Sequence, residues 1–214
     1  MSTTIEHRRT WWRRNRWGLV ALPVVLVLAL AAGSSRVHDY WWVRGFHQPA
    51  PVSAGVASLV DEYDDGRLSY PIEARYSVAS FGPADEVTLR RGEPLPAGVR
   101  AWRLELAVEA DPDMVLSGCQ LAVVDAEGNR HTADDSGLDL ETPSSPCVPS
   151  DTAGPRPMPG STAAPTLPVG EAPRPERYRT ETVFVLPQEA VPTAVRLWHL
   201  LPRYVELPVE ASGA

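Results

Sequence analysis

The residue types that most often do chemistry are sparse in this sequence. It has two cysteines, and its five histidines are scattered along the chain: His7, His38, His47, His131 and His199. It has no phosphate-binding Walker loop, no GxGxxG after a strand, and none of the motifs HExxH, GxSxG or CxxC. The sequence therefore predicts no catalytic residue, no bound cofactor and no metal site.

The two cysteines, Cys119 and Cys147, are best explained as a disulfide. An even number of cysteines in an oxidising compartment is expected to pair. The bond would close a loop of roughly 29 residues, which stabilises a fold by about 3–4 kcal/mol in the chain-entropy treatment. A metal site would need more ligands than two distant cysteines, and a catalytic cysteine would need a histidine brought close by the fold.

Clusters of carboxylates offer oxygen ligands but lack a metal-binding spacing. They lie at Asp61/Glu62/Asp64/Asp65, Asp111/Asp113 and Asp134/Asp135, and none has the EF-hand pattern for Ca²⁺. We interpret them as solvated turns. Of the histidines, only His131 and His199 fall in the predicted folded domain, and His199 is interpreted as a packed edge residue of a strand. An enzyme built on the acids and His131 stays an alternative.

The most informative stretch is the apolar run near the N-terminus. No charged residue lies between Gly18 and Gly33, and the 19 residues 17–35 form a helix long enough for the roughly 30 Å hydrocarbon core. Arginines precede the run, so the positive-inside rule places residues 1–16 in the cytoplasm as a basic tail. Aromatic residues at both ends suit the two membrane interfaces: Trp11, Trp12 and Trp17 on one side, and Tyr40, Trp41 and Trp42 on the other.

A cleaved signal peptide is the rival interpretation of this run. Ala29-Leu30-Ala31 fits a small-residue cleavage site, and HRRTWWR faintly resembles a twin-arginine signal. We favour a permanent anchor, because the run is long for a signal and an aromatic belt follows it at once. The sequence then predicts a single-pass protein of the plasma membrane whose C-terminal domain is extracytoplasmic.

The remaining chain has the texture of an all-β domain. Residues 36–69 are assigned to a juxtamembrane segment with a short helical piece at 53–60, and residues 70–210 to the domain. Apolar and polar residues alternate in VRAWRLELAVEA (99–110), which is typical of a strand with one buried face. Further strands are expected at 70–82, 118–125, 130–133, 177–187, 193–200 and 203–209. Several short strands with turn signals between them favour an immunoglobulin-like antiparallel β-sandwich.

One segment does not fit a compact sandwich. Residues 143–175 contain ten prolines mixed with Gly, Ser, Thr and Ala. Proline lacks the amide that a strand ladder needs, so we expect a long, poorly ordered loop inserted between strands. A PxxP-type piece there, such as 146–149, offers a docking motif as an alternative.

Charge and composition limit the kinds of partner that the chain is expected to bind. All twenty basic residues are arginine, which we interpret as the codon bias of a GC-rich genome. Residues 1–17 carry five arginines against one acid (5 − 1 = +4). Residues 36–214 carry 15 arginines against 26 acids (15 − 26 = −11), which gives the total of −7. An acidic outer domain argues against nucleic acid as a partner.

The arrangement resembles a known layout. With GCQLAVVDAEG, the later CVPSDTAGP and the preceding arginine-rich apolar segment, the chain resembles uncharacterised single-pass cell-envelope membrane proteins of GC-rich bacteria. Those proteins carry an extracytoplasmic immunoglobulin-like domain. The resemblance implies a β-sandwich stapled by Cys119 and Cys147, and it brings no catalytic residues with it.

These observations predict a non-catalytic, membrane-anchored interaction module of the cell envelope. Its partners would be the lipid bilayer and another envelope protein. Two alternatives stay open: a sensing domain that binds a cation or a cell-wall glycan, and a secreted immunoglobulin-like domain released by signal cleavage.

Overall fold

The computed structural model describes residues 3–133, 136–140, 142–143, 145–158 and 160–210, with side chains described from residue 14 onward. The chain forms two compact units, Met1–Gly45 and Phe46–Ala214.

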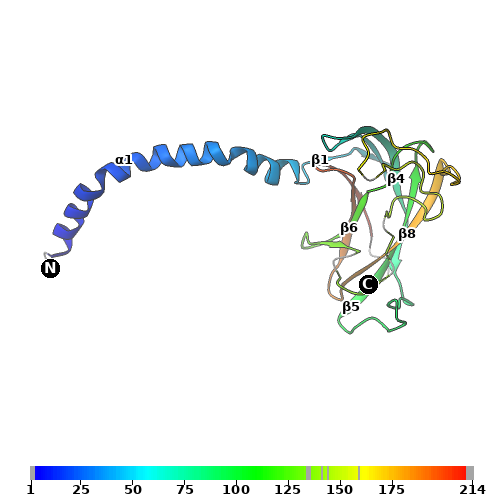
Figure 1. The fold of residues 1–214 in the computed structure, drawn as a ribbon. Coiled ribbons are helices and arrows are strands. Elements are labelled where there is room, and N and C mark those ends of the chain that lie inside the picture. The colour runs from blue at the N-terminus through cyan, green and yellow to red at the C-terminus, as the bar shows by residue number, and fades with distance from the viewer. Residues whose placement is uncertain (1–2, 134–135, 141, 144, 159, 211–214) are drawn as a thin grey trace. The chain divides into compact units, whose positions relative to one another are not determined.

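The first unit is one long apolar helix. Helix α1 spans Thr3–Val37 and continues as a π-helical turn, η1, over His38–Val43. Within Arg14–Val43, an 18-residue window has a mean hydropathy of 2.2, and no side chain in that window is buried. By length and composition it can cross a membrane, and a signal sequence would meet the same description. The sequence therefore correctly predicts an apolar N-terminal helix (Figure 1).

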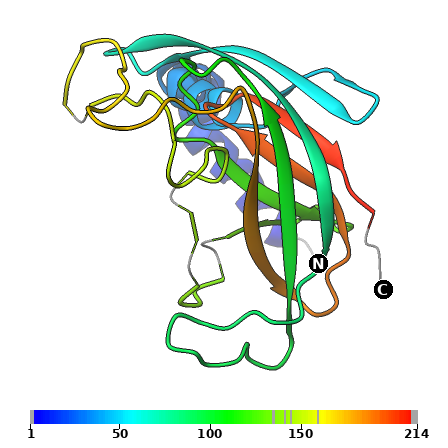
Figure 2. The same cartoon turned by 90° about the vertical axis from the view of Figure 1, so that its right-hand side faces the viewer.

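The second unit is a sandwich of two five-stranded sheets (Figures 1 and 2). The first sheet has the order β1-β10-β9-β6-β7, with bounds Gln48–Pro49, Arg203–Pro208, Pro192–Trp198, Gln120–Asp125 and Arg130–Thr132. The second sheet has the order β2-β3-β4-β5-β8, with bounds Val52–Ser53, Val56–Asp64, Ser69–Pro83, Val99–Glu109 and Arg177–Pro187. Strand β1 pairs in parallel with β10, and all the other described pairs are antiparallel.

Alternating side chains build the core between the sheets. On β5, Trp102, Leu104, Leu106 and Val108 are buried, whereas Arg103 on the opposite face is exposed. The same alternation contributes Phe184 and Leu186 from the neighbouring β8, and Leu121, Val123, Val195, Leu197, Val205 and Leu207 from the facing sheet. The all-β immunoglobulin-like sandwich predicted from the sequence is thus confirmed, with strands at each of the expected positions.

The sandwich begins earlier in the chain than the sequence analysis assigned. Strands β1, β2 and β3 lie within residues 36–69, which had been assigned to a juxtamembrane segment with a helical piece at 53–60. In β3, Ala57 and Leu59 face the core while Val56 and Val60 are exposed. These exposed valines hide the alternation in the sequence, and pairing with β4 over the whole strand decides the extended conformation.

The proline-rich segment 143–175 is more closely packed than expected. Its described residues form no strand, but Cys147, Val148 and Arg174 are buried in the body of the sandwich. Arg156 and Thr166 form an isolated antiparallel bridge within it.

A small second cluster covers part of the outer face of the second sheet. Ala101 and Val185 point away from the main core and are buried beneath Leu140. Leu138 and side chains from the β4–β5 connection, such as Leu89, pack around them. One end of that face is therefore closed, and the rest is open to solvent.

Candidate functional site

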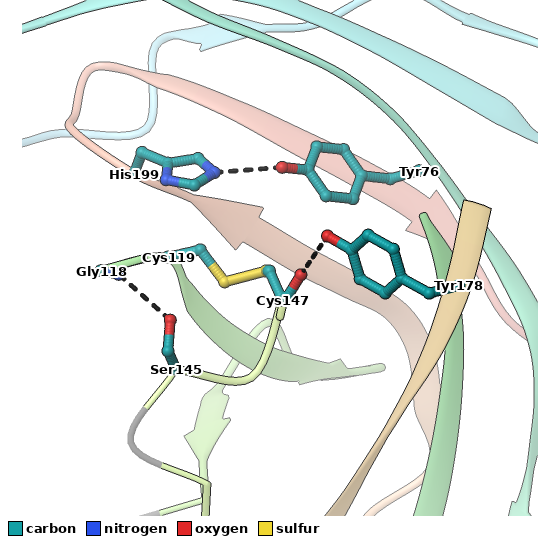
Figure 3. Close-up of a disulfide and its surroundings, with 7 residues drawn as sticks. All are labelled: Tyr76, Gly118, Cys119, Ser145, Cys147, Tyr178 and His199. Carbon is teal, nitrogen blue, oxygen red and sulfur yellow. Dashed lines mark hydrogen bonds between the residues drawn. A yellow bond between two sulfur atoms is a disulfide. The ribbon is translucent and has the colours of Figure 1, made fainter. Parts of the chain in front are cut away.

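Cys119 and Cys147 are joined in the predicted disulfide (Figure 3). Their Cα atoms are 6.0 Å apart and both side chains are buried. Two hydrogen bonds fix the bridge: Gly118 N donates to Ser145 Oγ at 3.1 Å, and Tyr178 Oη donates to the Cys147 carbonyl at 2.8 Å. The bond therefore ties the start of β6 to the root of the proline-rich segment.

His199 lies beside the core, just after β9, as a packed residue. Its Nε2 is 3.1 Å from Oη of Tyr76, which is fully buried (Figure 3). Burial lowers the pKa of His199 to about 4 and raises the pKa of Tyr76, so the pair is neutral at pH 7. A neutral imidazole accepts the hydrogen bond that the tyrosine donates.

A buried arginine holds the far end of the proline-rich segment. Arg174 Nη1 donates to the Ala153 carbonyl at 3.1 Å. Its Nη2 donates to the carbonyls of Asp111 and Met114 at 2.7 and 2.9 Å. The guanidinium carbon also lies 5.6 Å from the centre of the Tyr178 ring. Arg174 is thus a structural residue, although nothing in the local sequence marks it as one.

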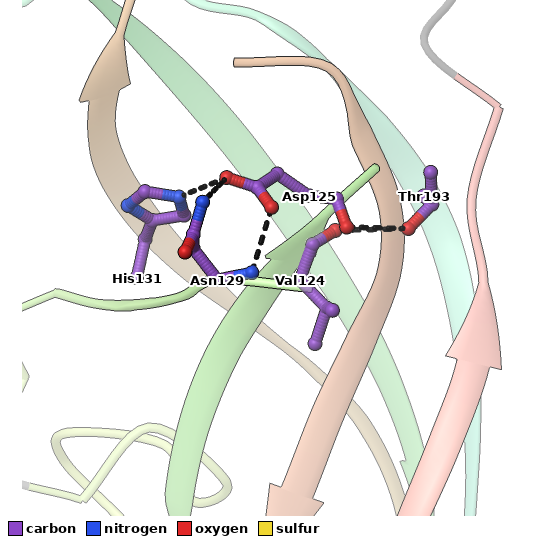
Figure 4. Close-up of polar contacts among 5 residues, drawn as sticks. All are labelled: Val124, Asp125, Asn129, His131 and Thr193. Carbon is purple, nitrogen blue, oxygen red and sulfur yellow. Dashed lines mark hydrogen bonds and ion pairs between the residues drawn. The ribbon is translucent and has the colours of Figure 1, made fainter. Parts of the chain in front are cut away.

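The structure brings together three polar residues that the sequence analysis left apart. Asp125 ends β6 with its carboxylate buried, and the following turn returns the chain so that His131 Nε2 lies 2.9 Å from Asp125 Oδ2 (Figure 4). The Asn129 backbone and side-chain amides donate to the same carboxylate at 2.8 and 3.0 Å. The neighbouring Thr193 hydroxyl donates to the Val124 carbonyl at 3.2 Å.

These bonds determine the charge state of Asp125. Burial raises the pKa of the carboxyl, but the hydrogen bonds from His131 and Asn129 outweigh it, so the pKa of Asp125 lies below its ordinary value. The short connection between the strands expected at 118–125 and 130–133 contained a signal for this cluster, because a tight hairpin brings Asp125 and His131 side by side. Without the strand register the contact is not evident.

The acidic cluster at 61–65 is only partly a turn: Asp61, Glu62 and Asp64 lie on β3, and the turn begins after them. The Asp64 carboxylate accepts from Gly66 N, and the Asp65 carboxylate accepts from Arg67 N and Leu68 N. These backbone bonds lower the pKa of Asp65. Asp134 and Asp135 lie outside the described residues. Among the described residues, no group of three or more His, Cys, Asp or Glu is placed to hold a metal ion.

The aromatic residues assigned to the membrane interfaces lie on the helical unit. The side chains of Trp11 and Trp12 are outside those described. Trp17 and, in η1, Tyr40, Trp41 and Trp42 are exposed. Arg44 lies over the Tyr40 ring at 5.0 Å, and Arg16 lies over the Trp17 ring at 5.7 Å. Exposed aromatic rings beside arginines suit the boundary of a bilayer.

The outer face of the second sheet carries paired charges, and we call it the charged face. It consists of Arg75, Arg103, Glu105, Glu109, Arg177, Arg179 and Glu181. Arg179 lies 3.0 Å from Glu105, Arg103 lies 3.1 Å from Glu181, and Arg177 lies 3.3 Å from Glu109. The bond from Arg179 lowers the pKa of Glu105. A shallow hollow of about 320 Å³ lies among these pairs over Val56, Ser77 and Ala107.

Comparison with known proteins gives no family assignment: no family model and no curated protein matches the chain. Among solved structures, the chain is similar to MPT63, a secreted protein from Mycobacterium tuberculosis, at 16% sequence identity and a TM-score of 0.39. The match covers 75% of this chain and 98% of that one. This chain itself has the layout predicted from the sequence, one apolar helix followed by a β-sandwich.

Proposed function

We propose that this protein is a membrane-anchored, extracytoplasmic interaction module of the cell envelope that performs no catalysis. The observation that carries the proposal is the charged face, an open sheet surface whose charges are held in register by neighbouring strands. The apolar helix would retain the module at the membrane, and the sandwich would present this face to another envelope protein.

The helix supports the anchoring part of the proposal. Its exposed apolar side chains, such as Val24 and Leu28, need a lipid environment, and the basic residues before it favour a cytoplasmic N-terminus. Only Arg44 and Gly45 separate η1 from Phe46, the first residue of the sandwich unit. The chain therefore has no long flexible tether between the two units.

The first residues of the sandwich are firmly held, which supports presentation of a defined surface. The guanidinium carbons of Arg130 and Arg196 lie 4.6 and 4.8 Å from the centre of the Phe46 ring. The ring also meets Trp198 and Tyr204 edge-on, with ring centroids at 5.0 and 5.2 Å. Such aromatic and cation–π contacts each contribute roughly 0.5–1.5 kcal/mol, so the entry of the chain is fixed.

The charged face has the properties of a recognition surface. Each arginine is positioned by a carboxylate, so little side-chain entropy remains to be lost on binding. Paired charges around a small apolar floor give orientation and specificity more than raw affinity. A partner with a matching pattern of charges would dock here, and the covered end beneath Leu140 would limit the contact area.

Site-specific photo-crosslinking in the intact membrane tests the proposal. A photoreactive phenylalanine replaces Ala107, at the centre of the charged face, and in a matched protein it replaces Glu127, in the turn after β6. We expect a discrete adduct from position 107 and none from position 127. Arg179→Glu should abolish the adduct, whereas Arg91→Glu, in an exposed loop, should leave it intact.

Two outcomes contradict the proposal. One is equal labelling from both positions, which would mean that the charged face has no specific partner. The other is turnover of a cell-wall or peptide substrate by the purified protein, which would show that the domain is an enzyme.

A further inference from the structure

A cavity opens on the side of the sandwich where β7 and β8, the edge strands of the two sheets, do not pair with each other. Its volume is about 410 Å³, within the range of small-molecule sites. The walls are mainly apolar and come from β5, β8 and the segment after β7, with Val99, Leu186 and Leu138 as examples. Three polar residues also line it, His131, Thr132 and Ser136, and each carries a hydrogen-bonding group.

The carboxylate of Asp125 holds the imidazole of His131 in one orientation. The buried Asp125 carboxylate binds Nε2 at 2.9 Å, and the two Asn129 amides hold that carboxylate in turn. An ionised carboxylate accepts hydrogen bonds, so it keeps the proton of the neutral ring on Nε2. The other nitrogen, Nδ1, is then an acceptor, and within the described residues only Asp125 bonds this ring.

Ser136 complements the histidine. Its Oγ accepts a hydrogen bond from Leu138 N at 3.3 Å, which leaves the hydroxyl proton available to donate. His131 and Ser136 therefore offer an acceptor and a donor among mainly apolar walls, and Thr132 adds a further hydroxyl to the lining. A hydroxyl group needs this combination, because it donates one hydrogen bond and accepts another.

We propose that this cavity binds a small, uncharged, largely apolar molecule bearing one hydroxyl group, which donates to His131 Nδ1 and accepts from Ser136. The apolar walls favour a hydrocarbon or aromatic body. An uncharged ligand is favoured because mainly apolar walls do not solvate a charge. Asp125 is a positioning residue, since it acts through His131.

This site goes beyond the interaction function proposed above and does not depend on it. The cavity lies at the open side of the sandwich, and the charged face lies on the outside of the second sheet. If the Asp125–His131 pair only stabilised the hairpin, the contacts around Asp125 would be the same as in a ligand-binding site. The ligand experiment must therefore read the free ring nitrogen directly.

The test uses the full-length protein in detergent, with ¹⁵N-labelled histidine, titrated at pH 8 with 4-fluorophenol. The probe 4-fluorotoluene has the same aromatic body without the hydroxyl. We expect the His131 Nδ1 resonance, assigned by its loss in His131→Gln, to shift saturably with 4-fluorophenol and to stay in place with 4-fluorotoluene. Ser136→Ala should weaken the binding about fivefold, the effect of one hydrogen bond.

A variant that fills the cavity completes the test. Leu138→Trp should abolish the saturable shift while the other histidine resonances stay unchanged, which reports an intact fold. A non-saturating shift, an equal shift with 4-fluorotoluene, or a shift that persists in both Leu138→Trp and Ser136→Ala would overturn the proposal.

Discussion

At the scale of single residues, the sandwich holds polar groups that respond to their burial. His199 and Tyr76 form a neutral hydrogen-bonded pair beside the core. Two threonines on β8, Thr180 and Thr182, turn buried hydroxyls toward the core, and neither hydroxyl has a partner among the described residues. Substitution of His199 is therefore expected to change the pH dependence of stability, whereas substitution of Thr182 is expected to raise stability.

His199 should make stability depend on pH. Its pKa is about 4 when folded and 6.5 when unfolded, so between these values the unfolded chain binds a proton that the native protein does not. Stability is then complete above pH 6.5 and declines as the pH falls toward 4. We expect a loss of roughly 1–2 kcal/mol between pH 7 and 5, measured by urea unfolding of the sandwich.

The variant His199→Gln provides the control, because glutamine still accepts a hydrogen bond from Tyr76 but does not titrate. Its unfolding free energy should be nearly flat over the same pH range. The carboxylates with lowered pKa values, Asp65, Glu105 and Asp125, titrate below this window. An unchanged pH slope in His199→Gln would assign the effect to another group.

Replacing Thr182 by valine should stabilise the protein. The two side chains have nearly the same shape, and a buried hydroxyl without a partner has a desolvation cost that valine avoids. We expect a gain of about 1 kcal/mol in the free energy of unfolding for Thr182→Val. Thr193→Val is the matched control and should lose about 1 kcal/mol, because the Thr193 hydroxyl donates to the Val124 carbonyl. A loss in Thr182→Val would show that its hydroxyl is bonded in solution.

At the scale of elements, the proline-rich segment is fixed at its ends. The disulfide at Cys147 holds its beginning, and the three carbonyl contacts of Arg174 hold its end. Gly154 lies against Arg174 with φ at +81°, and a Cβ added there would come within 2.9 Å of Nη1. Because Gly154 has no side chain, the Arg174 guanidinium can lie against the backbone at this position.

The substitution Gly154→Ala should therefore destabilise the sandwich by more than backbone strain alone. Gly170 lies in the same segment with φ at +88° and has no atom near the position of its Cβ, so Gly170→Ala measures the strain. We expect about 1 kcal/mol of destabilisation for Gly170→Ala and about 2–3 kcal/mol for Gly154→Ala. Equal effects in thermal unfolding would mean that the contact with Arg174 contributes nothing.

The elements also show which parts of the fold are readable from the sequence. Strands with strict alternation, such as 99–110, are predictable because each inward position is apolar. Strand β3 is not, because its exposed valines at 56 and 60 break the pattern. The anchoring of the proline-rich segment is also hidden, since Arg174 reaches carbonyls some 60 residues away in sequence. The Asp125–His131 contact depends on a hairpin register that the turn signal alone does not define.

At the scale of the whole molecule, the proposed extracytoplasmic location rests on the apolar helix and the disulfide. A disulfide persists in an oxidising compartment, and an N-terminal helix preceded by arginines delivers the following domain to that side of a membrane. The anchor and the cleaved signal differ in what happens afterwards at Ala29-Leu30-Ala31. The mass of the mature protein separates the two, because cleavage there removes the whole apolar run.

We predict that the protein recovered without reduction from the membrane fraction has the mass of the uncleaved chain and contains no thiol that reacts with an alkylating reagent. Reduction and denaturation should then expose two thiols, from Cys119 and Cys147. Leu26→Arg, at the centre of the apolar run, should lower membrane retention, because an arginine there costs about 3 kcal/mol on insertion scales, whereas Leu26→Phe should not. A mass that corresponds to a chain starting near Ala32 would instead identify a secreted domain. Two free thiols before reduction would contradict the extracytoplasmic assignment.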